Sequence, residues 1–210
     1  IMLPDCAYIQ EMEVERKNRK LARANKPLLE PIYTMQDAEK CMEQFIGVSY
    51  NSEIEIFPDV KVVFHDAGHI LGSAMIEVLT DGQKLIYSGD IGNTNQPIIN
   101  DPTLFTEADY VIMEATYGNR FHIETEDKMQ RLMQIIKKTV RKGGNLVIPA
   151  FAVERTQDLI YRLKKLDTEG ELPDIDVYVD SPLAIKATEI FRNNPEYFDQ
   201  EAGEFLAEHD

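Results

Sequence analysis

The sequence is short of several features that would point away from an ordinary globular protein. No apolar run in its 210 residues reaches the roughly 18 residues that a membrane span needs. The beginning of the chain has no basic segment followed by an apolar one, so it does not resemble a signal peptide. Cys6 and Cys41 have no CxxC spacing and indicate reduced thiols; one disulfide between them is the alternative. We therefore expect a cytoplasmic protein with no membrane partner.

Positive charge is also scarce. The sequence has 22 Lys and Arg against 37 Asp and Glu, a net charge of −15 at pH 7. This excess argues against a protein that coats nucleic acid through bulk electrostatics. It does not exclude a nuclease, because a local basic groove or a bound metal can reverse the field at a site. A basic cluster between Arg16 and Arg23 indicates an exposed helix or, as the alternative, an RNA-contacting surface.

The first half of the chain predicts two helices and a set of hairpin strands. Residues 6–24 are rich in Glu, Lys, Arg and Ala, which favours a helix, and Thr34 with Asp37 can form the capping box of a second one. The runs AMIEVLT and KLIYSGD read as strands joined by a turn at Asp81-Gly82. Further strands are expected at residues 60–65 and 110–114. This half is therefore α+β in character.

The second half changes rhythm after YVIME. Helices are predicted at residues 124–141 and 153–165 and from Ser181-Pro182, and they alternate with the strand-like runs NLVIPA and DVYVD. Helices and strands that alternate in this way are typical of βα units on a parallel sheet. The expected fold class is α/β with an α+β first half, divided into two domains near residues 116–121.

Two side chains with the chemistry of metal ligands stand at the ends of predicted strands. His69 lies in the glycine-rich loop HDAGHILGSA, and Asp90 follows the apolar run KLIYSG. A buried carboxylate needs a partner, which is either a turn that it caps or a cation. Because the hairpin sends the chain out and back, we expect His69 and Asp90 to meet at one edge of the sheet. Imidazole and carboxylate donors suit zinc.

Five blocks together resemble a known family. HDAGHILGSA, IYSGDIGN, YVIMEATYG, GGNLVIPAFAVERTQDLIYRL and VYVDSPLA, in this order, resemble the β-CASP branch of the metallo-β-lactamase superfamily, RNA-cleaving metallohydrolases related to the pre-mRNA 3′-end endonuclease. The resemblance implies part of a metallo-β-lactamase αββα sandwich in residues 1–118. The first part of a parallel-sheet β-CASP domain would follow in residues 119–210.

The resemblance also implies roles for three residues. His69 matches a ligand to one zinc, and Asp90 matches the carboxylate that bridges two zincs in the family's complete site. Glu114 matches an acid that orients a catalytic histidine found later in the family's sequence; a structural carboxylate is the alternative. Two metals can clamp a phosphodiester and generate hydroxide, and a histidine held by a carboxylate can protonate the leaving oxygen.

Weaker signals come from four other residues. Arg155 begins a predicted helix, where it could hold a phosphate of the substrate or form a surface salt bridge. Ser181 begins another helix and could bind an anion or cap the helix. His65 is expected to be structural, and His209 to face solvent.

The departure from the family is large. The HxHxDH cluster that supplies most of the superfamily's zinc ligands does not occur in the sequence, and neither do the later β-CASP histidines. The sequence therefore predicts an internal fragment with an incomplete site, which is inactive alone, of a protein that uses two Zn²⁺ per active site and acts on RNA.

Several alternatives stay open. The parent protein could be a non-catalytic scaffold subunit, because the family includes members without metal ligands. A DNA-processing β-CASP nuclease is less favoured, because such relatives typically carry Asp where this chain has Glu114. A small-molecule hydrolase would not need the segment after Tyr117. Endo- versus 5′-exonucleolytic action and a homodimer are also left open.

Overall fold

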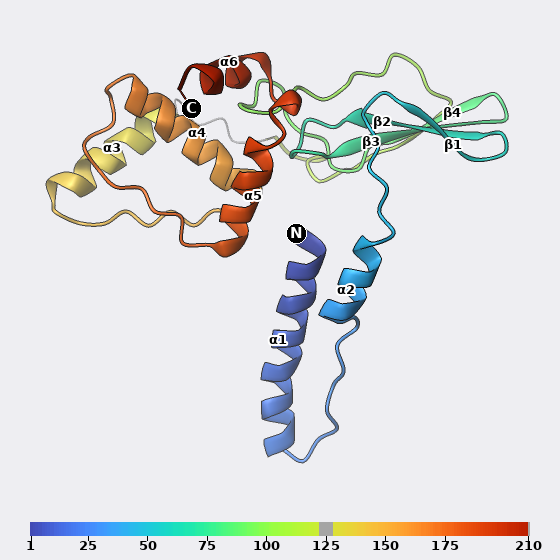
Figure 1. Cartoon of the computed structure of the whole chain (residues 1–210), viewed down its shortest axis with the longest axis horizontal. Helices are drawn as coiled ribbons and strands as arrows, with labels where there is room; N and C mark the ends of the chain where they lie inside the picture. The colour runs from blue at the N-terminus through green and yellow to red at the C-terminus, as the bar shows by residue number, and fades with distance from the viewer. Residues whose placement is uncertain (122–127, 210) are drawn as a thin grey trace. The chain divides into compact units, whose positions relative to one another are not determined.

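The computed structural model describes residues 1–121 and 128–209, the last of these by its backbone alone (Figure 1). His122, the first residues of the helix expected at 124–141 and the side chain of His209 lie outside this description. The chain divides into two compact units, Ile1–Val48 and Ser49–Asp210. In the part of the chain that is described, no helix is long and apolar enough to cross a membrane.

The fold class is α/β, as the sequence predicts. The helices are α1 (Met2–Arg23), α2 (Met35–Met42), α3 (Lys128–Arg141), α4 (Arg155–Thr168), α5 (Pro182–Arg192) and α6 (Gln200–His209), with the 3₁₀ turn η1 (Pro195–Tyr197). The strands are β1 (Glu53–Phe57), β2 (Val60–Asp66), β3 (Ala74–Thr80), β4 (Gln83–Tyr87) and β5 (Tyr110–Ile112).

The first unit is a helical hairpin of α1 and α2. The predicted capping box begins α2: the Asp37 amide donates to Thr34 Oγ1 at 3.2 Å, and the Thr34 amide donates to the Asp37 carboxylate at 2.9 Å. The segment that returns from α1 is held by the Asn18 side chain, which bonds both the amide and the carbonyl of Leu29 at 2.8 Å. Ala7 and Ala38 are the buried contacts of this small unit.

The second unit contains one five-stranded sheet in the order β1-β2-β3-β4-β5. The first four strands are antiparallel neighbours, and β5 joins β4 in parallel. The predicted hairpin between β3 and β4 is confirmed, since Asp81 and Gly82 both have positive φ, 50° and 73°, as a type I′ turn requires. The turn sets the register Thr80↔Gln83, which places Val78 opposite Leu85.

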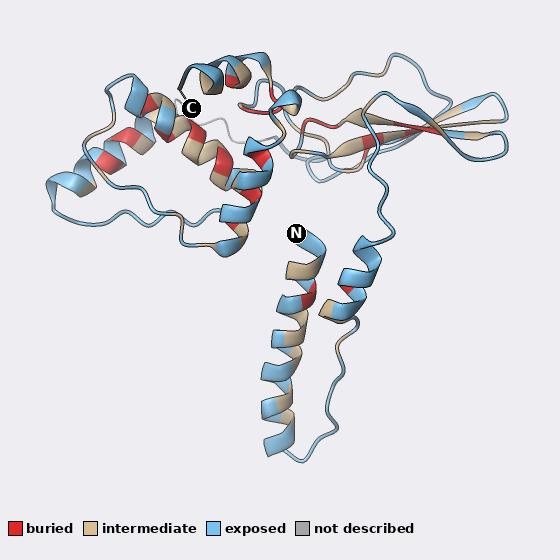
Figure 2. Cartoon of the chain, in the orientation of Figure 1, coloured by how far each residue is buried: buried red, intermediate tan, exposed pale blue. Residues whose placement is uncertain are grey.

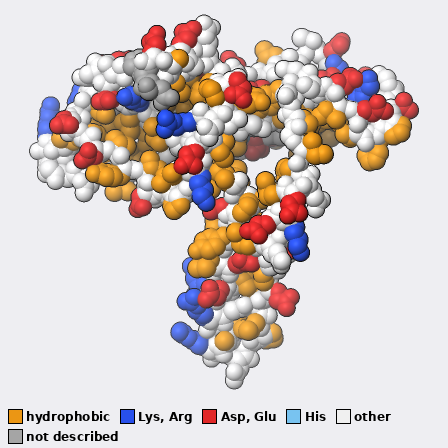
Figure 3. Space-filling view, in the orientation of Figure 1, with side chains coloured by type: hydrophobic (Ala, Val, Ile, Leu, Met, Phe, Trp, Pro, Cys, Tyr) orange, Lys and Arg blue, Asp and Glu red, His pale blue; other side chains and the backbone are white. Residues whose placement is uncertain are grey.

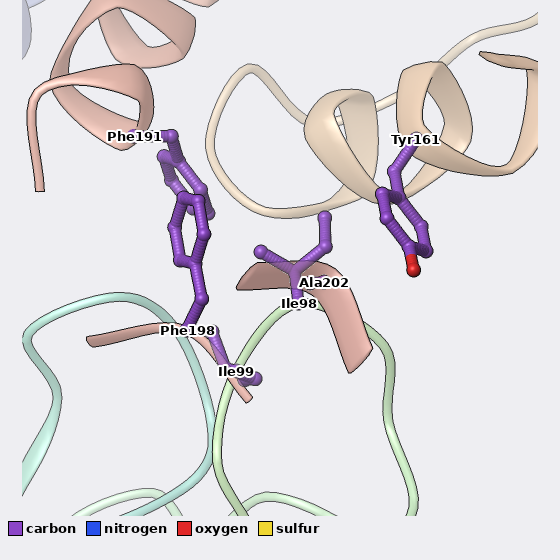
Figure 4. Close-up of a cluster of buried hydrophobic side chains, with 6 residues drawn as sticks. All are labelled: Ile98, Ile99, Tyr161, Phe191, Phe198 and Ala202. Carbon is purple, nitrogen blue, oxygen red and sulfur yellow. The ribbon is translucent and has the colours of Figure 1, made fainter. Parts of the chain in front are cut away.

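Helices α3 to α6 form the other part of this unit, and each of α3, α4 and α5 has buried residues along its length (Figure 2). One cluster joins α4, α5 and α6 to the loop that follows Asp90, through Ile98, Ile99, Tyr161, Phe191, Phe198 and Ala202 (Figure 4). The Asp199 amide donates to the Ile98 carbonyl at 2.8 Å, which fixes that loop against the helices. The loop after β4 is thus part of the core.

The strands predicted at NLVIPA and DVYVD are wrong for this structure, in which residues 145–150 and 176–180 have no strand conformation. Val147 is 85% exposed and Tyr178 is 83% exposed. A parallel strand exists only when a neighbour accepts its backbone hydrogen bonds, and apolar β-branched residues do not supply that neighbour themselves. Among the described residues, no strand lies beside either segment.

Candidate active site

Two loops at one edge of the sheet form the candidate site. One follows β2 and carries His69; the other follows β4 and carries Asp90. Gly92 lies against the backbone of Gly68 so closely that a Cβ built at Gly92 would overlap the Gly68 carbonyl group. The Gly92 amide donates to the Ala67 carbonyl at 2.9 Å. Only glycine permits this approach of two backbones, and the approach brings the two loops together.

The approach brings the two predicted ligands within reach of each other. His69 Nε2 lies 3.9 Å from Asp90 Oδ2, with the side chains 43% and 76% exposed. The geometry agrees with the expectation that the hairpin returns Asp90 to the edge where β2 ends. Because both side chains face solvent, their mutual attraction is screened, and both are accessible to a ligand.

Glu114 lies beside the same loop. The Ile91 amide donates to Glu114 Oε1 at 2.7 Å, and the Glu114 amide donates to Ser88 Oγ at 3.0 Å. The hydrogen bond from Ile91, then one from the Thr116 side chain, and to a smaller extent the charge of His69 hold the pKa of the Glu114 carboxyl below its usual value. Glu114 is therefore a carboxylate at neutral pH. The amide of Ile91, the residue after Asp90, holds it next to Asp90.

His69 and Asp90 have the donor atoms that zinc prefers, but they are fewer than a protein zinc site needs. Imidazole nitrogen and carboxylate oxygen are zinc ligands, and protein zinc sites have three or four such groups. Within residues 1–121 and 128–208, no three His, Cys, Asp or Glu side chains are grouped closely enough to hold a metal ion. His69 and Asp90 thus carry the right kinds of donor atom, but no third such side chain joins them within the described residues.

His65 belongs to a separate polar network in the sheet. Its Nδ1 lies 2.9 Å from Asn51 Oδ1, and its Nε2 lies 2.7 Å from the Glu77 carboxylate, which also pairs with Lys84 at 3.1 Å. Phe105 packs edge-on against the imidazole, with ring centroids 4.9 Å apart. Both ring nitrogens are engaged by neighbouring side chains, which agrees with the structural role expected for His65.

Arg155 and Ser181 lie at the beginnings of α4 and α5, as expected. Arg155 is exposed, with Nη1 3.4 Å from the Asp158 carboxylate on its own helix. Ser181 is the N-cap of α5, and its hydroxyl accepts the Ala184 amide at 3.2 Å. The salt bridge and the helix cap, which were the alternatives to substrate binding, are both formed. A role in binding substrate remains a prediction for each residue.

Glu154 was not predicted, yet it contacts the loop that carries His69. It precedes α4 with φ of 69°, and its carboxylate accepts the Leu71 amide. Its Oε2 is buried without a hydrogen-bond partner among the described residues, and burial raises the pKa of Glu154 to about 7. In the sequence, Glu154 is only an acidic residue at the end of the apolar run PAFAV, which indicates neither its burial nor its contact with Leu71.

Comparison with known proteins gives a family match within the second unit. Residues 156–210 match the model of the Beta-Casp domain. The matched segment begins in α4 and contains α5 and α6.

Individual proteins are similar over a larger part of the chain. Ribonuclease TTHA0252 of Thermus thermophilus is 34% identical over 182 residues, which are 86% of this chain and 41% of that protein. Transcription termination factor FttA of Methanosarcina mazei is 36% identical over 168 residues, 77% of this chain and 26% of that protein. Cleavage and polyadenylation specificity factor 73 of Drosophila melanogaster is 30% identical over 163 residues, 77% of this chain and 24% of that protein. The chain thus spans less than half the length of these relatives.

Proposed function

We propose that this chain, which matches the Beta-Casp domain at residues 156–210 and is similar to a ribonuclease over 86% of its length, belongs to a protein that hydrolyses RNA with the help of zinc. The observation that carries the proposal is the convergence of His69, Asp90 and Glu114 at one sheet edge. The name of the Thermus thermophilus relative, a ribonuclease, supports the reaction and the substrate class.

The three side chains have distinct proposed roles. His69 offers an imidazole nitrogen and Asp90 a carboxylate to zinc, and the complete protein would add the remaining ligands. Bound zinc polarises a phosphodiester and lowers the pKa of a water molecule. Glu114 stays ionised beside the Ile91 amide and can orient a histidine that acts as proton donor. Arg155 and Ser181 remain candidates for contacts with substrate phosphates.

The proposed domain division follows the same similarity. Residues 1–118 would belong to the metallo-β-lactamase domain and residues 119–210 to the β-CASP domain. A cytoplasmic location and a homodimer complete the proposal; size-exclusion chromatography with light scattering tests the dimer.

The reaction is tested with the complete protein and a labelled single-stranded RNA. His69→Ala and Asp90→Asn should each lower kcat/KM by at least about a hundredfold, because metal ligation supplies several kcal/mol of transition-state stabilisation. Glu114→Gln should cause a smaller loss. The matched control is Glu107→Gln, which removes an exposed carboxylate elsewhere and should leave the rate unchanged. Full activity in His69→Ala would contradict the proposal.

Metal binding by this 210-residue chain is tested separately by calorimetry with Zn²⁺. With two donors at the site, we expect weak binding, and binding should weaken further in Asp90→Asn. Tight stoichiometric binding of two zinc ions would show that the chain holds a complete site, contrary to the proposal of a part.

Two other functions make different predictions. A non-catalytic scaffold subunit would bind RNA without cutting it. The similarity to a protein named as a transcription termination factor, and not as a nuclease, favours this second candidate. A DNA-processing enzyme would cut single-stranded DNA faster than RNA of the same sequence. Parallel assays of cleavage and binding on both substrates separate the three.

A further inference from the structure

The first unit differs sharply from the second in charge. Ile1–Val48 contains eight acidic and seven basic residues, whereas the rest of the chain contains 29 acidic and 15 basic ones. Nearly the whole excess of negative charge therefore lies in the second unit. Within the first unit the basic residues are concentrated: six of the seven lie between residues 16 and 26, RKNRKLARANK, where no acidic residue occurs.

The helix geometry gathers three of these cations on one face of α1. The side of α1 that packs inward is a stripe at intervals of four and three residues, made of residues that are all buried or half-buried: Ala7, Glu11, Val14, Asn18 and Leu21. At 100° per residue, Arg16, Lys20 and Arg23 point to the opposite side. All three are exposed.

These cations are also free of the ion pairs that neutralise their neighbours. Lys17 pairs with Glu13 at 3.6 Å, and Arg19 pairs with Glu15 at 2.6 Å. Arg16, Lys20 and Arg23 form no ion pair with any residue that the structure describes. Figure 3 shows Lys and Arg side chains gathered along the C-terminal half of α1.

Attraction to the helix dipole explains only part of the arrangement. Cations in the last turn of a helix are favourable, which accounts for Lys20 and Arg23. Arg16 lies two turns before the end, where the dipole has little effect, and like charges four residues apart disfavour the helix. A row of cations that extends over about 10 Å is instead complementary to consecutive phosphates of a nucleic-acid strand.

We propose that Arg16, Lys20 and Arg23 form a docking surface for the phosphate backbone of single-stranded RNA. The inference rests on the proposed action on RNA and adds a contact outside the candidate active site. The contacts are to phosphates, so the surface adds affinity without sequence preference. The second unit has 29 acidic and 15 basic residues, and this net negative charge disfavours RNA binding there. A basic face on the first unit gives the strand a defined place to bind.

The test measures fluorescence anisotropy of a labelled polyuridine RNA with the 210-residue chain, without metal so that binding is separated from cleavage. The probe has about 20 nucleotides, more than the roughly 4–16 that single-strand sites commonly cover. The variant R16E/K20E/R23E should bind at least about tenfold more weakly, and its slope of log K against log salt should fall by about 2, since each phosphate contact contributes about 0.7.

The matched control is K137E/K138E/R141E, which makes the same change of charge on exposed positions of α3 and should keep the affinity within about twofold. The conservative variant R16K/R23K should also keep it. Circular dichroism checks that α1 is intact, and R16Q/K20Q/R23Q repeats the test if the charge reversal disturbs the helix.

Equal losses in the α1 and α3 variants, or no loss in either, would overturn the inference. The inference would also be overturned if the wild-type chain sedimented with phosphatidylserine vesicles and did not bind RNA, because the basic face would then bind a lipid surface. The proposed function fails in a different way: the complete protein would then bind RNA through α1 and leave it uncut. Cleavage that survives while R16E/K20E/R23E binds RNA normally overturns only the docking surface.

Discussion

The antiparallel strands β1 to β4 and the segment from residue 145 to 180 are both rich in apolar, β-branched runs, yet only the first forms a sheet. Each of β1 to β4 pairs with the strand next to it in the chain. The runs NLVIPA and DVYVD are separated by helix α4, and neither has a strand beside it within the described residues. Short turns supply a partner locally, whereas parallel strands depend on distant ones.

The largest expected effect contrasts a side chain from each region. Ile86→Ala in β4 should lower the free energy of unfolding by about 4 kcal/mol, because Ile86 is 4% exposed and its truncation leaves a cavity in the core. Val147→Ala, at a position 85% exposed, should change it by less than about 0.5 kcal/mol. Urea denaturation followed by circular dichroism measures both. Similar losses in the two variants would show that residues 145–150 are packed like a strand.

The next effect tests the close approach beside the candidate site. Gly92→Ala should destabilise the chain by about 3 kcal/mol, because the added methyl group overlaps the Gly68 backbone. Gly203→Ala in α6, where a Cβ meets no atom within 4 Å, is the control and should stabilise by up to about 1 kcal/mol. Thermal unfolding compares the two. A harmless Gly92→Ala would mean that the two loops do not touch.

A smaller effect is expected from the polar network of the sheet. Burial raises the pKa of Glu77, but hydrogen bonds from Lys84 and His65 outweigh it and hold the pKa below its usual value of 4.5. The ionised Glu77 carboxylate therefore stabilises the fold above pH 4.5, and this stabilisation is lost as the pH falls through the lowered pKa of Glu77. Glu77→Gln should cost about 2 kcal/mol at pH 7 and flatten the acid limb of a stability–pH curve. An unchanged acid limb would contradict the network.

The smallest effect has the opposite sign and belongs to the helical region. Burial raises the pKa of Glu154 from 4.5 to about 7, so the folded chain holds a proton that the unfolded chain releases. Its contribution is therefore present below pH 4.5 and declines as the pH rises to about 7. Between these pH values the free energy of unfolding should fall by about 1 kcal/mol, once solvent screening is allowed for. Glu154→Gln should remove this fall. Urea denaturation at pH 5 and 7 measures it; a wild-type decline that persists in the variant would sink this assignment.

Local signals in the sequence predicted local structure well. The Asp81-Gly82 turn, the Thr34 cap and the helices beginning at Arg155 and Pro182 are all formed, because each depends on neighbours a few residues away. The meeting of His69 and Asp90 was also predictable in outline, since a hairpin must return the chain to its starting edge. The unpaired NLVIPA run was not, because strand formation depends on a distant partner.

Glu154 shows what the sequence concealed at the site. Nothing in the letters VERTQ marks its positive φ, its burial or its hydrogen bond from Leu71. These properties arise only when α4 packs near the loop that carries His69, about eighty residues earlier in the chain. The same packing decides which oxygen of Glu154 lacks a partner.

The sequence by itself determined the helices, the hairpins and the types of donor atom at the candidate site, because propensity, turn chemistry and side-chain chemistry act over a few residues. Only the tertiary structure decided that Gly92 meets Gly68, that the Ile91 amide holds Glu114, and that NLVIPA stays exposed. Those outcomes require segments that are distant in sequence to come within hydrogen-bonding or van der Waals contact, and no local pattern encodes which segments will do so.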